Sequence, residues 1–81
     1  MNPEKESRIE ILDRLYYSGE LKKLVSEEIL SPRWLVWRNI YHAFNQRLES
    51  TGSKMQAMEE VSENFNVSRS LIEKVRRYFQ E

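Results

Sequence analysis

The 81-residue sequence contains no cysteine and a single histidine, His42. Disulfides, thiolate metal sites and cysteine nucleophiles are therefore excluded, which fits a reducing compartment. One histidine with scattered carboxylates forms no recognisable metal site or acid–base arrangement. With only two glycines, the chain also lacks a glycine-rich phosphate loop. We therefore expect no metal, no cofactor and no enzymatic activity.

An excess of charge and a long apolar run are also missing. The chain has 13 basic and 13 acidic residues and a pI of about 6.6, so no overall basic excess marks a nucleic-acid partner. No apolar run approaches the roughly 18 residues of a membrane-spanning helix. The N-terminal residues are too polar for a signal peptide. The sequence predicts a cytoplasmic protein without a membrane partner.

Apolar residues at helical spacing are plentiful, and no segment alternates as a strand would. We predict one all-α domain over residues 1–81, because so short a chain cannot support two cores. Asn2-Pro3 predicts the first helix start, with Glu4 and Glu6 in its first turn, and Gly19 predicts its end. About five helices are expected, arranged as an N-terminal helical hairpin (1–31), a central aromatic-rich helix (32–49) and a helix pair (54–79).

The central helix is the most hydrophobic of the five. Its aromatic and leucine side chains recur every three or four residues, and further apolar residues widen this stripe beyond one packed face. Either the N-terminal helices or a second copy of the chain could cover it. Because two tryptophans are hard to bury in so small a monomer, we expect a homodimer through the N-terminal and central helices. The stripe consists of Trp34, Trp37, Tyr41, Phe44 and Leu48.

Residues 54–79 predict two short helices joined by a tight turn. Ser53 and Gln56 have the spacing of a capping box, so the first helix should start at Lys54. Ser62 is small where the two helices approach most closely, and Asn66 tolerates the positive φ that the turn requires. Ser68 is expected to cap the second helix, about 69–79. The inward positions are Met55, Met58, Val61 and Phe65 on the first helix and Leu71, Ile72, Val75 and Phe79 or Tyr78 on the second.

The second helix of this pair carries a local positive charge. Residues 68–80 contain four basic residues and one acid, whereas residues 1–31 contain seven acids and five basic residues. Local fields decide what a surface attracts, so a polyanion is expected at the C-terminal helix. Serine or arginine at a helix start can meet base edges or phosphates, and later lysines and arginines can bind phosphate. The candidate DNA-binding residues are Ser68, Arg69, Ser70, Glu73, Lys74, Arg77 and Lys54.

The segment Val61 to Val75, VSENFNVSRSLIEKV, resembles the helix-turn-helix of bacterial and phage transcription regulators, whose turn typically reads Phe-Gly-Val-Ser. The long helix with Trp37, Tyr41 and Phe44 is similar to the arrangement in the Trp repressor and in the DNA-binding domain of the replication initiator. This resemblance implies specific or semi-specific binding of double-stranded DNA, with helix 69–79 in the major groove. A small homodimeric transcription regulator is the expected function.

Acidic residues oppose this interpretation. The first helix of the pair bears Glu59, Glu60 and Glu63, and Glu73 lies on the proposed reading face. They weaken phosphate binding unless Glu73 accepts a hydrogen bond from a cytosine amino group. The alternative is a helical protein–protein interaction or adaptor module that does not bind DNA.

Overall fold

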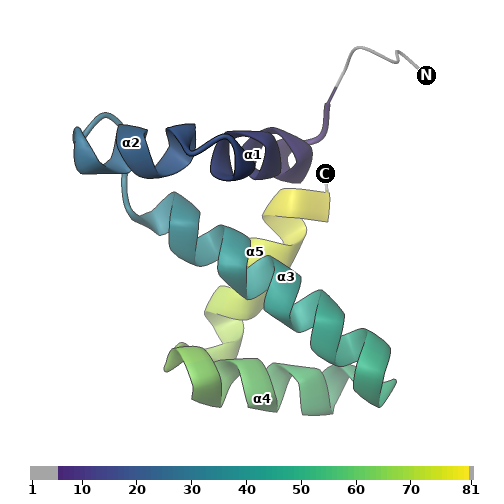
Figure 1. Cartoon of the computed structure of the whole chain (residues 1–81). Helices are drawn as coiled ribbons and strands as arrows, with labels where there is room; N and C mark the ends of the chain where they lie inside the picture. Colours follow the sequence, from purple (N-terminus) through teal and green to yellow (C-terminus); the bar gives the residue numbers. More distant parts are fainter. Residues whose placement is uncertain (1–5, 81) are drawn as a thin grey trace.

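The computed structural model describes residues 6–80, which form five α-helices and no strand (Figure 1). The prediction of an all-α fold is confirmed. The longest helix, Arg33–Thr51, lies in the middle of the chain. The helices are α1 (Arg8–Tyr17), α2 (Glu20–Ser26), α3 (Arg33–Thr51), α4 (Lys54–Phe65) and α5 (Arg69–Gln80).

The start of α1 differs from the prediction. Asn2, Pro3 and Glu4 lie outside the described residues. Glu6 precedes α1, so the prediction that Glu6 lies in the first turn of the helix was wrong. Ser7 is the N-cap: its hydroxyl accepts from the Glu10 N–H at 3.3 Å, and the Glu10 carboxylate accepts from the Ser7 N–H at 2.8 Å. This reciprocal capping box sets the boundary.

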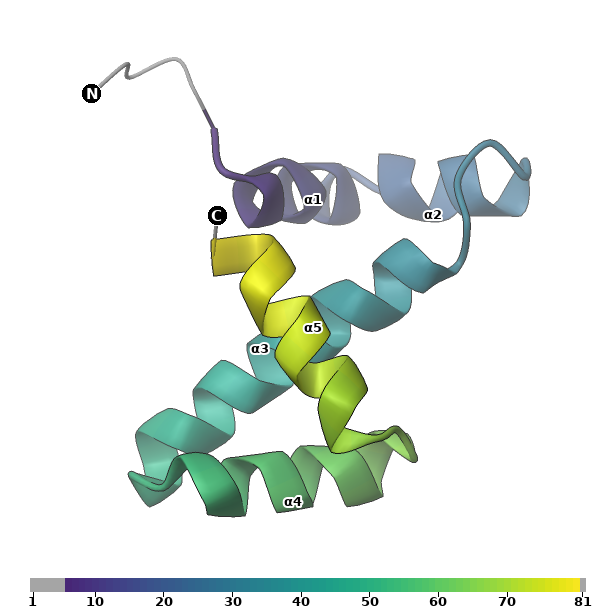
Figure 2. The ribbon, with the colours of Figure 1, turned by 180° about the vertical axis from the view of Figure 1, so that it is seen from behind.

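The first two helices do not fold back on each other as the predicted hairpin would. In both views α1 and α2 follow one another along the same side of the molecule (Figures 1 and 2). Each contributes a buried leucine, Leu12 from α1 and Leu21 from α2, to the common core. The apolar stripes of both helices therefore face that core.

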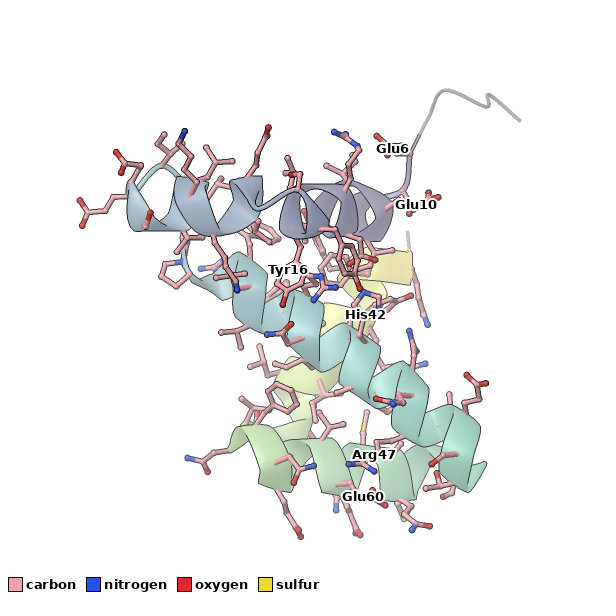
Figure 3. The ribbon with its side chains drawn as sticks, in the orientation of Figure 1. Glu6, Glu10, Tyr16, His42, Arg47 and Glu60 are labelled. Atoms are coloured by element: carbon pink, nitrogen blue, oxygen red, sulfur yellow. The ribbon has the colours of Figure 1, made fainter. Side chains whose placement is uncertain are left out.

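One hydrophobic core joins the helices. Figure 2 shows α3 and α5 crossing, with α4 running from the end of α3 to the start of α5. An ion pair of 3.5 Å between Arg47 of α3 and Glu60 of α4 lies at the edge of this core (Figure 3). The buried apolar side chains are Leu12, Leu21, Ile40, Phe44, Ala57, Val61, Ile72, Val75 and Phe79.

The two tryptophans of α3 are half-buried within a single chain. Tyr78 of α5 lies against both, with ring centroids 5.5 Å from Trp34 and 5.7 Å from Trp37. Further along the helices, Tyr41 and Phe79 approach to 5.1 Å. The aromatic stripe of α3 is therefore covered partly by the C-terminal end of α5, an arrangement that the hydrophobic spacing alone does not specify.

A polar cluster fastens α1 to α3. Arg38 is only 7% exposed, and its Nε donates to Asp13 at 2.7 Å. His42 Nε2 donates to the same carboxylate at 2.8 Å, and the Arg38 guanidinium stacks on Tyr16 at 3.7 Å from the ring centroid (Figure 3). Because the buried charge is paired and hydrogen-bonded, this cluster tolerates its burial. The sequence pattern does not reveal this acidic partner of His42, since Asp13 lies 29 residues away.

Phe44→Ala should lower the free energy of unfolding by about 3–5 kcal/mol, because Phe44 is fully buried and its truncation leaves a cavity. Urea denaturation followed by circular dichroism measures this difference. Val36→Ala, at an exposed position of the same helix, is the matched control and should change the value far less. Equal effects of the two substitutions would contradict the assignment of Phe44 to the core.

Candidate nucleic-acid interface

The turn between α4 and α5 comprises Asn66, Val67 and Ser68. Asn66 has φ 54° and ψ 49°, so the predicted positive φ is confirmed. The Ser62 hydroxyl donates to the Val67 carbonyl at 2.6 Å, and the Ser62 carbonyl accepts from the Val67 N–H at 3.1 Å. Ser62 thus ties the turn together in addition to being small. These bonds set the direction in which α5 leaves α4.

Serine side chains cap both helices. The Ser53 hydroxyl accepts from the Gln56 N–H at 3.2 Å, and the Ser68 hydroxyl accepts from the Leu71 N–H at 3.1 Å. Both predicted caps are therefore present. The predicted return bond, from the Ser53 N–H to the Gln56 side chain, was wrong, because that N–H donates to the Thr51 hydroxyl at 3.2 Å. The Gln56 amide instead donates to Glu60 at 3.2 Å, one turn further along α4.

The inward face of α4 is narrower than expected. Val61 is buried, Met58 and Phe65 are half-buried, but Met55 is 68% exposed. The prediction that Met55 points inward was wrong. Ala57 takes the buried position at this end of α4, which turns Met55 toward a surface hollow of about 310 Å³. This α4–α5 hollow is lined by Lys54, Met55, Met58 and Arg69.

Most of the predicted contact residues lie exposed on α5, its cap and the start of α4. Glu73 is the exception, with a side chain only 31% exposed. The basic side chains divide into two groups. Arg69 pairs with Glu59 at 3.0 Å, and Lys54 lies 3.7 Å from Glu73, whereas Lys74 and Arg77 have no ion pair among residues 6–80. The exposed candidates are Ser68, Arg69, Ser70, Lys74, Arg77 and Lys54.

Arg76, which is not among the predicted DNA-binding residues, holds Glu73 in place. Its guanidinium donates to Glu73 Oε1 at 2.6 Å and lies 4.7 Å from the ring centroid of Phe44. Its Nε is buried without a hydrogen-bond partner in the described part of the chain. The three-residue spacing on one helix could have indicated the pair. The partnership of Glu59 and Arg69 could not be found this way, because it depends on how α4 and α5 cross.

The hydrogen bond from Arg76, followed by the nearby charge of Lys54, lowers the pKa of Glu73 below its ordinary value of 4.5. A lowered pKa in the folded state means that Glu73 favours folding above its unfolded pKa. This contribution is lost as the pH falls through the folded pKa. Arg76→Met keeps the apolar packing on Phe44 but removes the donor.

Arg76→Met should therefore raise the pKa of Glu73, because the carboxylate loses the group that most favours its charged form. A carbon-13 NMR titration of the Glu73 carboxyl group measures the change. Lys74→Met removes a neighbouring cation that does not pair with Glu73 and is the control. An unchanged titration midpoint in Arg76→Met would show that the hydrogen bond does not govern the charge of Glu73.

No family model, curated protein or solved structure matches the chain. Among residues 6–80, no group of three or more histidine, cysteine or carboxylate side chains is placed to hold a metal ion. None of the helices in the same range has the length and apolar character needed to cross a membrane.

Proposed function

We propose that the chain binds double-stranded DNA through the outer face of α5 and acts as a small transcription regulator. The observation that carries the proposal is that Lys74 and Arg77, both without an ion pair within residues 6–80, are exposed on the helix that also exposes Ser70. The turn before α5, with Asn66 at positive φ, supports the resemblance to a helix-turn-helix. A major groove about 12 Å wide admits an α-helix.

Each exposed side chain has a role in this arrangement. Arg69 and Ser70, at the start of α5, are suited to base edges or phosphates, because recognition helices approach the bases with their N-terminal residues. Lys74, Arg77 and, at the start of α4, Lys54 are suited to phosphates. Glu73 can only accept hydrogen bonds, and the base edge that matches it in the major groove is the cytosine amino group.

A homodimer forms part of the proposal, because a single recognition helix makes few contacts and two copies can read two half-sites. Tyr78 already covers Trp34 and Trp37 partly, so the tryptophans alone do not require a second copy. Support comes instead from exposed Ile29 and Val36 and from an apolar hollow of about 260 Å³ near the N-terminal helices. The hollow is lined by Arg8, Ile11, Leu12, Leu30, Trp34 and Tyr78.

Neutralising Lys74 and Arg77 together, as Lys74→Gln with Arg77→Gln, should weaken binding to a random-sequence duplex. The slope of log K against log salt should become shallower by about 0.9 for each phosphate that is no longer neutralised. Fluorescence anisotropy over a salt series measures both quantities. Lys22→Gln with Lys23→Gln, which removes two exposed charges from α2, is the control and should leave the slope unchanged. An unchanged slope in the α5 variant would refute the assigned binding surface.

Ile11→Glu should convert the proposed dimer into a monomer, because it places a charge in the apolar hollow of the interface. Sedimentation of the wild-type chain and the variant measures this change, and the circular dichroism spectrum should stay helical. Met55→Glu, which changes an exposed apolar residue of α4 outside this hollow, should remain dimeric. A wild-type chain that sediments only as a monomer would refute the dimer and leave DNA binding to be judged separately.

One observation favours the alternative, a protein-interaction module. Arg69 and Lys54 are both paired with acids, and exposed Met55 lies in the hollow that they line, so α4 presents a mixed apolar and neutralised surface. Protein interfaces are less basic than DNA interfaces. A folded chain that fails to bind duplex DNA at both low and high salt would favour this alternative.

A further inference from the structure

We infer that Glu59 and Glu73 are specificity determinants that keep Arg69 and Lys54 from binding phosphates of non-specific DNA. This inference rests on the proposed function. It concerns the regulation of the same surface and identifies one residue, Glu59, that is absent from the predicted DNA-binding residues. The two carboxylates lower affinity for random duplex and so widen the difference between a target site and other DNA.

The two cations line a single hollow, and each is paired with a carboxylate. Arg69 Nη2 lies 3.0 Å from Glu59 Oε1, and Lys54 Nζ lies 3.7 Å from Glu73 Oε1. Both Arg69 and Lys54 line the α4–α5 hollow of about 310 Å³, whose other lining side chains are methionines. The two cations could each neutralise a phosphate, but with their paired carboxylates the net charge at the hollow is close to zero.

A phosphate that enters this hollow must take a cation from its carboxylate. The exposed pair of Arg69 and Glu59 opens readily, because solvent-exposed ion pairs contribute little. Once open, however, the Glu59 carboxylate remains close to the phosphate, and two like charges repel. Non-specific binding depends on phosphate contacts alone, so it bears this repulsion without compensation. At a target site, hydrogen bonds to base edges can offset it.

The two carboxylates differ in the number of cations that they contact. Glu73 also accepts a hydrogen bond from Arg76 at 2.6 Å. The Arg76 side chain is only 16% exposed and packs on Phe44, so it fixes the position of the Glu73 carboxylate. Glu59 has Arg69 as its ion-pair partner among the described residues, and both side chains are more than half exposed. Glu73 therefore stays in place, while Glu59 is the carboxylate that exchanges for phosphate. Removal of Glu59 should change how many phosphates the surface neutralises.

The test compares Glu59→Gln with Glu63→Gln on random duplex over a salt series. Glu63 is another exposed acid of α4 and has no ion pair within residues 6–80, so both variants lose one negative charge. Glu59→Gln should have a salt slope steeper by about 0.9 than Glu63→Gln, because Arg69 becomes available to one more phosphate. At about 0.1 M salt, this corresponds to an increase in affinity on the order of fivefold to tenfold.

Arg69→Gln completes a double-mutant cycle. In the wild-type chain it should change the salt slope little, whereas in the Glu59→Gln chain it should return the slope to that of Glu63→Gln. Identical slopes for Glu59→Gln and Glu63→Gln, or an equal effect of Arg69→Gln in both backgrounds, would overturn the inference while leaving the proposed function intact. If the folded wild-type chain and all variants fail to bind duplex at low salt, both the inference and the proposed function are wrong.

Discussion

The burial of Phe44 between α3 and the α4–α5 pair is the contact on which the candidate interface depends. Phe44 is completely buried in the core that also contains Val61 of α4 and Val75 of α5. The Arg76 guanidinium lies over this ring, 4.7 Å from its centroid, and in turn holds Glu73. One apolar contact therefore sets the crossing of the helices and, through Arg76, the position of a charged group on the surface.

Although the chain has no net charge, the cations of α4 and α5 fall into a paired group and an unpaired group. Toward the start of α5, Arg69 is compensated by Glu59 and Lys54 by Glu73, while further along α5 Lys74 and Arg77 have no such partners among residues 6–80. Counting charges along the sequence assigns all four cations to one basic surface. Of these four cations, Lys74 and Arg77 are the two without an ion pair among residues 6–80, so a polyanion meets an uneven field.

The N-terminal helices are attached by a different kind of interaction. Leu12 and Leu21 bury apolar surface, but Asp13, Arg38 and His42 add a directional polar contact between α1 and α3. A buried arginine requires its partner, so Asp13 and Arg38 must meet when α1 packs on α3. That placement leaves Ile11 exposed beside the apolar hollow that we propose to be the dimer interface.

Local chemistry in the sequence determined the helical fold, the boundaries of α4 and α5, and the turn between them. Ser53, Asn66 and Ser68 act within a few residues of their own positions, so their roles can be read from neighbouring sequence. The same local rule misplaces the start of α1, because Asn2-Pro3 also has the pattern of a helix start and competes with the capping box of Ser7 and Glu10. Only the tertiary structure decided that Met55 is exposed and that Glu59 pairs with Arg69. Both outcomes depend on the angle at which α4 and α5 cross, which follows from packing on Phe44 and not from either helix alone.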